Sequence, residues 1–171
     1  MNLQSNDFEL FGVPQQFAQH RAELDDRWKA LQREAHPDKF ATQGAAAQRV
    51  AMQYSVRINE AYQRLKDPLK RAAYLCELGG APIQAHSNTA MPAAFLMQQM
   101  EWREALDEAG SVEALEALRD NVAVVQKELM NACARQLDVE QNFPGAVLNV
   151  RALMFIEKFA RDLDRAFDKF D

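Results

Sequence analysis

Two helical apolar patterns flank the tripeptide His36-Pro37-Asp38 and restrict how the first half of the chain can fold. Before the tripeptide, apolar side chains recur every three or four residues, as on one face of a helix: Leu24, Trp28, Leu31 and Ala35. After it, a second series follows the same rule: Val50, Tyr54, Ile58, Ala61 and Leu65. Pro37 disfavours the α conformation at the preceding residue, so the first helix should end there. The patterns therefore predict two packed amphipathic helices with the tripeptide at the tip between them.

The rest of the chain also favours helix, because it has only six Gly and six Pro and few β-branched residues. Asp67-Pro68 predicts the start of a short helix that ends at Gly79-Gly80. Residues 79–91 have mixed polarity and no period, so we expect them to connect two domains, 1–78 and 92–171. Three longer amphipathic patterns in 92–171 predict an antiparallel three-helix bundle, which makes the expected fold class all-α.

The charge, the cysteines and the N-terminus exclude several classes of protein. The net charge of -5 comes from the C-terminal half and argues against a nucleic-acid partner. Cys76 and Cys133 belong to no Cys-x-x-Cys pair, which predicts buried thiols in a reducing compartment and no metal site, bound cluster or other cofactor. No apolar run approaches the length of a membrane span, and the N-terminus has no basic and apolar leader. We therefore expect a cytoplasmic protein of bacterial origin with no membrane partner.

His36 and Asp38 are the first candidates for a functional site. A catalytic role would need a nucleophile or a cavity that converges on them, and the proline between them works against an oriented acid–base pair. We therefore expect no enzymatic activity. The plainest alternative is that Pro37 ends one helix while Asp38 helps to cap the next.

The stretch from Phe95 to Glu108 is the second candidate. Its apolar and acidic side chains fall along adjacent ridges of one helix, and a single bundle contact cannot bury them all. The pattern leaves two interpretations open. One is a thick core contact, and the other is an exposed apolar strip bordered by carboxylates, which would bind a protein.

Three segments resemble the J-domain, the module that stimulates ATP hydrolysis by DnaK-class chaperones. They are Asp7 to Pro14, Trp28 to Phe40 and Asp67 to Leu78, in the family's order and spacing. The resemblance implies that the chaperone is engaged by the tip and the helix before it: His36, Pro37, Asp38, Lys39, Arg27 and Arg33. For Arg27 and Arg33 the alternative is an ordinary solvated face, and Lys29 is left undecided.

Residues 94–108, following this J-domain, narrow the resemblance to the HscB family, the co-chaperones of iron–sulfur cluster assembly. That resemblance implies a C-terminal domain that binds an IscU-type scaffold and a J-domain that stimulates an HscA-type chaperone. The implied scaffold-binding residues are Leu96, Met97, Met100, Glu101, Glu104, Glu108 and Phe155. Two alternatives stay open: a J-domain co-chaperone for a different client, which buried Leu96, Met97 and Phe155 would favour, and a helical adaptor that stimulates no ATPase.

Overall fold

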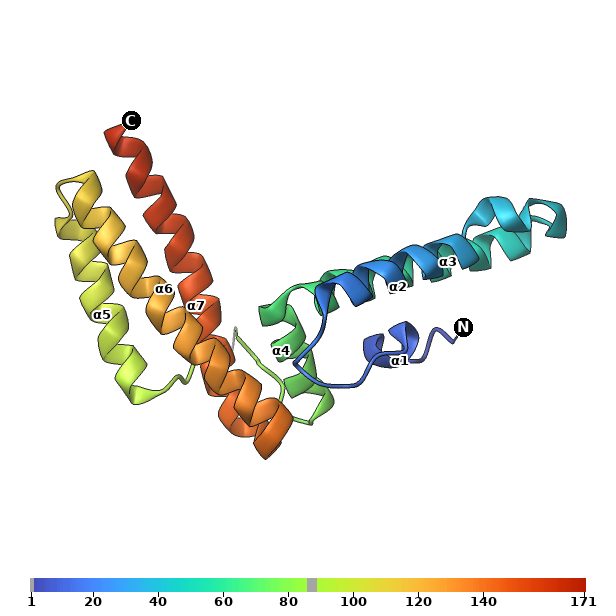
Figure 1. Ribbon diagram of the computed structural model, residues 1–171, viewed down its shortest axis with the longest axis horizontal. Helices are drawn as coiled ribbons and strands as arrows, with labels where there is room; N and C mark the ends of the chain where they lie inside the picture. Colours follow the sequence, from blue (N-terminus) through green and yellow to red (C-terminus); the bar gives the residue numbers. More distant parts are fainter. Residues whose placement is uncertain (1, 86–88) are drawn as a thin grey trace. The chain divides into compact units, whose positions relative to one another are not determined.

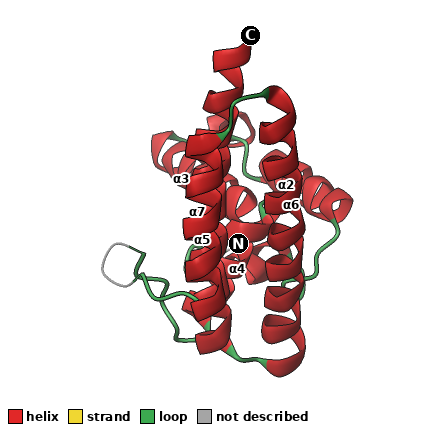
Figure 2. Cartoon of the chain, turned by 90° about the vertical axis from the view of Figure 1, so that its left-hand side faces the viewer, coloured by secondary structure: helices red, strands yellow, loops and turns green. Residues whose placement is uncertain are grey.

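The computed structural model describes residues 2–85 and 89–171. Every regular element in these two ranges is helical, so the expected all-α fold is confirmed (Figure 2). The chain divides into two compact units, Met1–Leu75 and Cys76–Asp171. The expected boundaries, 1–78 and 92–171, stay a prediction, and residues 86–88 of the expected connection lie outside the described residues.

The first unit is organised around two paired helices, α2 (Arg21–Glu34) and α3 (Ala45–Lys66), which lie side by side (Figure 1). A 3-10 segment, Pro37–Gln43, joins them. The Trp28 indole N–H donates to the Asn59 side chain at 2.9 Å, and the Trp28 and Tyr62 rings stack with centroids 4.9 Å apart. One turn nearer the tip, Gln32 and Ser55 hydrogen-bond each other. Because partners that are later in α2 are earlier in α3, the two helices run antiparallel.

The apolar face expected for α3 is buried only in part. Ile58, Ala61 and Leu65 are fully buried, whereas Val50 is exposed. Val50 lies near the end of α2, where it lines a hollow of about 390 Å³ with Ala35 and other residues, so no helix covers it.

The short helix α1 (Asp7–Phe11) packs its two phenylalanines into the first unit. Asn6 caps this helix, because its side chain accepts from the Glu9 N–H at 2.9 Å. Asp7 is instead fully buried and forms ion pairs with Arg57 and Arg64 of α3, at 2.8 and 2.6 Å. A buried carboxylate therefore fixes α1 to α3.

Helix α4 (Pro68–Leu78) begins as expected, because the Asp67 side chain accepts from the Leu69 N–H at 2.9 Å. Its last turn belongs to the second unit. There the chain passes close to the start of the last helix, since a Cβ at Gly79 would overlap the ring of Phe143.

The second unit is a bundle of α5 (Ala93–Glu108), α6 (Val112–Arg135) and α7 (Phe143–Phe167). Ser111 and Asn142 cap α6 and α7 with their side chains. Most core residues come from α6 and α7, whereas α5 buries only Phe95 and Trp102. Helix α7 ends at Phe167, and Phe170, in the 3-10 turn that follows, is exposed.

The segment before α5 is held on the bundle by one buried side chain. Arg151 of α7 donates from Nε to the Ile83 carbonyl at 2.9 Å and from a terminal nitrogen to the Ala90 carbonyl at 3.2 Å. Ile83 itself is buried. The parts of 79–91 that the structure describes are therefore anchored on their own unit.

Candidate functional site

The tripeptide lies at the tip of the first unit, where His36 precedes the 3-10 segment and Pro37 and Asp38 begin it. His36 is extended, with φ -63° and ψ 127°, as expected for the residue before a proline. Its Nδ1 accepts from the Asp38 backbone N–H at 3.2 Å and lies 3.6 Å from the Asp38 carboxylate. The Asp38 side chain is 91% exposed. Both polar groups therefore face solvent, an arrangement suited to contact with another protein.

The basic residues expected to flank the tripeptide are all exposed, but they do not form one group. Arg33 follows Lys29 by four residues, so these two side chains share a face of α2. Arg27 lies on another side of the helix, with a Glu23 carboxylate at 3.6 Å. Lys39 is exposed beyond the tip, in the 3-10 segment. Lys29 and Arg33 therefore lie close together on α2, and Arg27 lies apart from both.

The apolar residues expected on α5 are exposed. The exposed fractions are 47% for Leu96, 67% for Met97 and 74% for Met100. Glu101, Glu104 and Glu108 are exposed on the same helix. Of the two interpretations of this stretch, the structure favours the apolar strip bordered by carboxylates, because only Phe95 and Trp102 of α5 enter the core.

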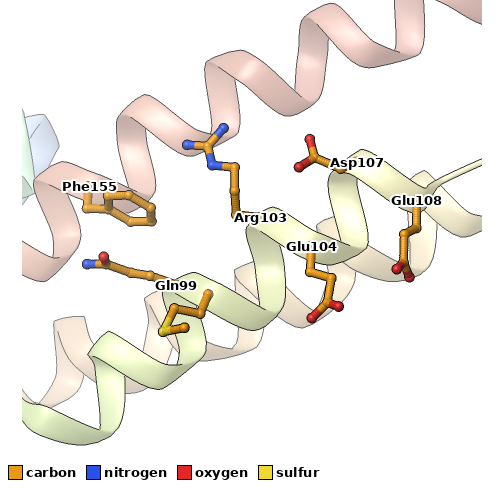
Figure 3. Close-up of a pocket in the computed structure, with 7 residues that line it drawn as sticks. Gln99, Arg103, Glu104, Asp107, Glu108 and Phe155 are labelled. Carbon is orange, nitrogen blue, oxygen red and sulfur yellow. The ribbon is translucent and has the colours of Figure 1, made fainter.

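A groove of about 620 Å³ lies between α5 and α7 (Figure 3). It brings together four of the expected residues, Met100, Glu104, Glu108 and Phe155. The other three, Leu96, Met97 and Glu101, lie on the exposed face of α5 and do not line the groove.

Three further residues line this groove and were missed by sequence reasoning: Gln99, Arg103 and Asp107. They recur every fourth residue, in a row beside Met100, Glu104 and Glu108, so a count of helical rows could have found them.

Phe155 is half-buried because its ring belongs to a cluster of four aromatic side chains. Its ring centroid lies 5.8 Å from that of Phe95 and 6.1 Å from that of Phe159. Trp102 completes the cluster, with centroids 5.8 Å from both Phe95 and Phe159. We refer to Phe95, Trp102, Phe155 and Phe159 as the aromatic cluster. Because two members come from each helix, it fixes α5 against α7 and places Phe155 at the groove.

The groove offers apolar surface next to three carboxylates and suits a partner with apolar and basic side chains. Within the described ranges, no group of three or more His, Cys, Asp or Glu side chains could hold a metal ion. The helices that the structure describes include none that is both long and apolar enough to cross a membrane.

The chain is similar to known proteins over most of its length. Residues 91–164 match the model of the HSCB C-terminal oligomerisation domain. The co-chaperone HscB homolog of Bordetella avium is 46% identical over 157 residues, which cover 91% of this chain and 94% of that protein. The homolog of Cupriavidus taiwanensis is also 46% identical, over 99% of this chain and 97% of its own.

Two solved structures share the fold. The chaperone HscB from Vibrio cholerae has a TM-score of 0.82 at 36% identity, covering 98% of this chain and all of its own. The human co-chaperone HscB has a TM-score of 0.88 at 26% identity, covering 96% of this chain and 83% of its own.

Proposed function

The chain belongs to the HscB family of co-chaperones, and on this basis we propose that it delivers an IscU-type iron–sulfur scaffold to an HscA-type chaperone. The second unit binds the scaffold through Leu96, Met97, Met100, Glu101, Glu104, Glu108 and Phe155. The first unit engages the chaperone through His36, Pro37, Asp38, Lys39, Arg27 and Arg33, and stimulates its ATP hydrolysis. The chain itself catalyses no reaction and takes no cofactor.

The exposed apolar strip on α5 is the observation that carries the scaffold-binding proposal. Had Leu96, Met97 and Phe155 been in the bundle core, a different client would have been favoured. Leu96 and Met97 are exposed instead, and Phe155 borders an open groove. Burying such residues at an interface stabilises a complex, and the carboxylates beside them select basic groups on the partner.

The co-chaperone acts by holding two partners at once. A scaffold bound to one unit of the chain is presented to the chaperone at a raised effective concentration when the other unit engages that chaperone. ATP hydrolysis then tightens the chaperone's grip on the scaffold, which favours release or transfer of the cluster, the cargo of the system.

Steady-state ATP turnover by an HscA-type chaperone tests the chaperone half of the proposal. We expect wild-type chain to raise turnover, more so with scaffold present, and His36→Gln to abolish the increase. His20→Gln is the matched control, because His20 is exposed and its side chain caps no helix. Stimulation that survives His36→Gln would contradict the proposed role of the tripeptide, and no stimulation at all would favour the adaptor.

Calorimetric titration of the scaffold into the chain tests the other half. We expect Met97→Ser to weaken binding by about fivefold or more, since removing an apolar side chain at the centre of an interface can cost over about 1 kcal/mol. Val124→Ser is the matched control, because Val124 is similarly exposed but lies on α6. Equal effects of the two substitutions would contradict the proposed binding face.

Raising the salt concentration should also weaken the complex, because the exposed carboxylates of α5 attract basic groups through screened charge interactions. An affinity that does not change with salt would leave the apolar contacts alone as the basis of binding.

A further inference from the structure

We propose that Arg103 and Asp162 form an ion pair that holds α5 in the position in which the groove accepts the scaffold. Arg103 is therefore a positioning residue for docking, a role that rests on the scaffold-binding function proposed above. Arg103 extends from α5 towards α7 (Figure 3). Its terminal nitrogen lies 3.1 Å from an Asp162 carboxylate oxygen. The pair thus joins the two helices that form the groove.

Apart from this pair, α5 is attached to α7 through the aromatic cluster. Only Phe95 and Trp102 of α5 are buried, whereas ten residues of α7 are. The α5 residues expected to meet the scaffold are exposed and contribute little to holding the helix in place. A helix attached by so few side chains can shift at low cost, and a shift would change the groove.

Arg103 also contacts the aromatic cluster directly. Its guanidinium carbon lies 5.1 Å from the centroid of the Phe159 ring, within the range of a cation–π contact. Phe159 stacks in turn on Phe155, which lines the groove. Arg103 therefore contacts the groove, the cluster and Asp162 at once. Asp162 also lies 3.7 Å from Arg165 on its own helix, which restrains the carboxylate.

The positive charge of Arg103 allows an experiment to distinguish a positioning role from a direct effect of the groove's charge on the partner. Among the residues that line the groove, Arg103 is the cation, beside Glu104, Asp107 and Glu108. If charge alone mattered, removing Arg103 would make the groove more negative and tighten binding of a basic partner, whereas removing Asp162 would weaken it. If the pair positions α5, both removals weaken binding, because both release the same contact.

The size of the effect follows from the exposure of the pair. The Arg103 and Asp162 side chains are 44% and 27% exposed, and pairs of this kind contribute modestly to the position of a helix. A contact can change affinity only by the amount it favours the binding-competent position. We therefore expect a loss of affinity of about threefold to tenfold, with the cation–π contact included.

The test measures the affinity of the full chain for an IscU-type scaffold by calorimetry. The variants are Arg103→Ala, Asp162→Ala and the double substitution. Two controls on α7 make the same changes in charge at exposed positions outside the groove. They are Arg161→Ala, which removes a positive charge, and Asp164→Ala, which removes a negative charge. We expect both single variants to bind about threefold to tenfold more weakly, the double variant to bind no more weakly than the worse single variant, and the controls to bind within twofold of wild type.

Three results would overturn the proposal. Tighter binding by Arg103→Ala with weaker binding by Asp162→Ala would assign the effect to charge. Losses that add in the double variant would show two independent contacts. Unchanged affinity with a lowered melting temperature would give the pair a purely structural role.

Amide hydrogen exchange of the unbound chain separates this proposal from the function on which it rests. We expect both single variants to speed exchange in α5 and to leave exchange in the buried part of α7 unchanged. If the wild-type chain does not bind the scaffold, the proposed function fails, while faster exchange in α5 would still establish that the pair holds the helix. Unchanged exchange in α5 would overturn the positioning role whatever the scaffold does.

Discussion

Removing the Asp7 carboxylate should destabilise the first unit more than any surface substitution would. Asp7 is fully buried, and its two oxygens face the guanidinium groups of Arg57 and Arg64. Asp7→Ala leaves both cations without their shared counter-ion, and breaking a buried pair in this way typically costs about 3–5 kcal/mol.

The structure places the expected cost at the lower end of that range. The Arg64 side chain is 38% exposed and can regain water, and Arg57 keeps a hydrogen bond to the Ser5 carbonyl at 2.9 Å. We therefore expect a loss of about 3 kcal/mol from Asp7→Ala. For a unit of this size, such a loss lowers the melting temperature by about 12 °C or more.

Hydrogen exchange followed by mass spectrometry is the suitable assay, because it reports each unit separately. The two tryptophans, Trp28 and Trp102, lie in different units, so whole-chain fluorescence would mix the two transitions. Exchange in α3 should become faster in Asp7→Ala, while exchange in α6 should not change. Asp26→Ala, at an exposed position of α2, is the matched control. A loss below about 1 kcal/mol, or one equal to that of the control, would refute the assignment of Asp7 as a buried ionic anchor.

Two further predictions concern the second unit. Gly79→Ala should lower the stability of this unit by about 1–3 kcal/mol, because the new Cβ overlaps the Phe143 ring. Gly110→Ala is the control and should change stability little, because nothing lies within 4 Å of its Cβ. Urea titration compares the two variants, and equal midpoints would contradict the close approach of Gly79 to Phe143. Burial raises the pKa of the Cys76 thiol to about 11 and that of Cys133 to about 12, from an ordinary value near 9. The folded state therefore holds these protons more tightly than the unfolded state, so stability is full below about pH 9 and falls as the pH rises towards 12. Urea midpoints at pH 8 and pH 10.5 should show this fall, and Cys133→Ala should reduce it; a fall of the same size in the variant would assign it to other groups.

Local patterns in the sequence were enough to predict the helices and most of their ends. The side chain of Asp67 begins α4 and that of Ser111 begins α6, because a helix start depends on residues within one turn of it. Likewise, Pro37 ends α2 at Glu34 through its effect on the residue before it. The sequence also indicated the tripeptide and the α5 stretch as candidate sites, but helical spacing left open whether the α5 residues were exposed or in the core.

The tertiary structure decided which of those rows are covered. Asp7 and Arg57 are 50 positions apart along the chain, and the sequence offered no reason to pair them. The same holds for Arg103 with Asp162, and for Phe155 with Phe95. Periodicity describes one helix at a time, whereas the burial of a side chain depends on which other helix lies against it. The sequence by itself therefore determined the helices, their caps and the candidate faces, and only the packing of α5 on α7 turned one of those faces into a groove.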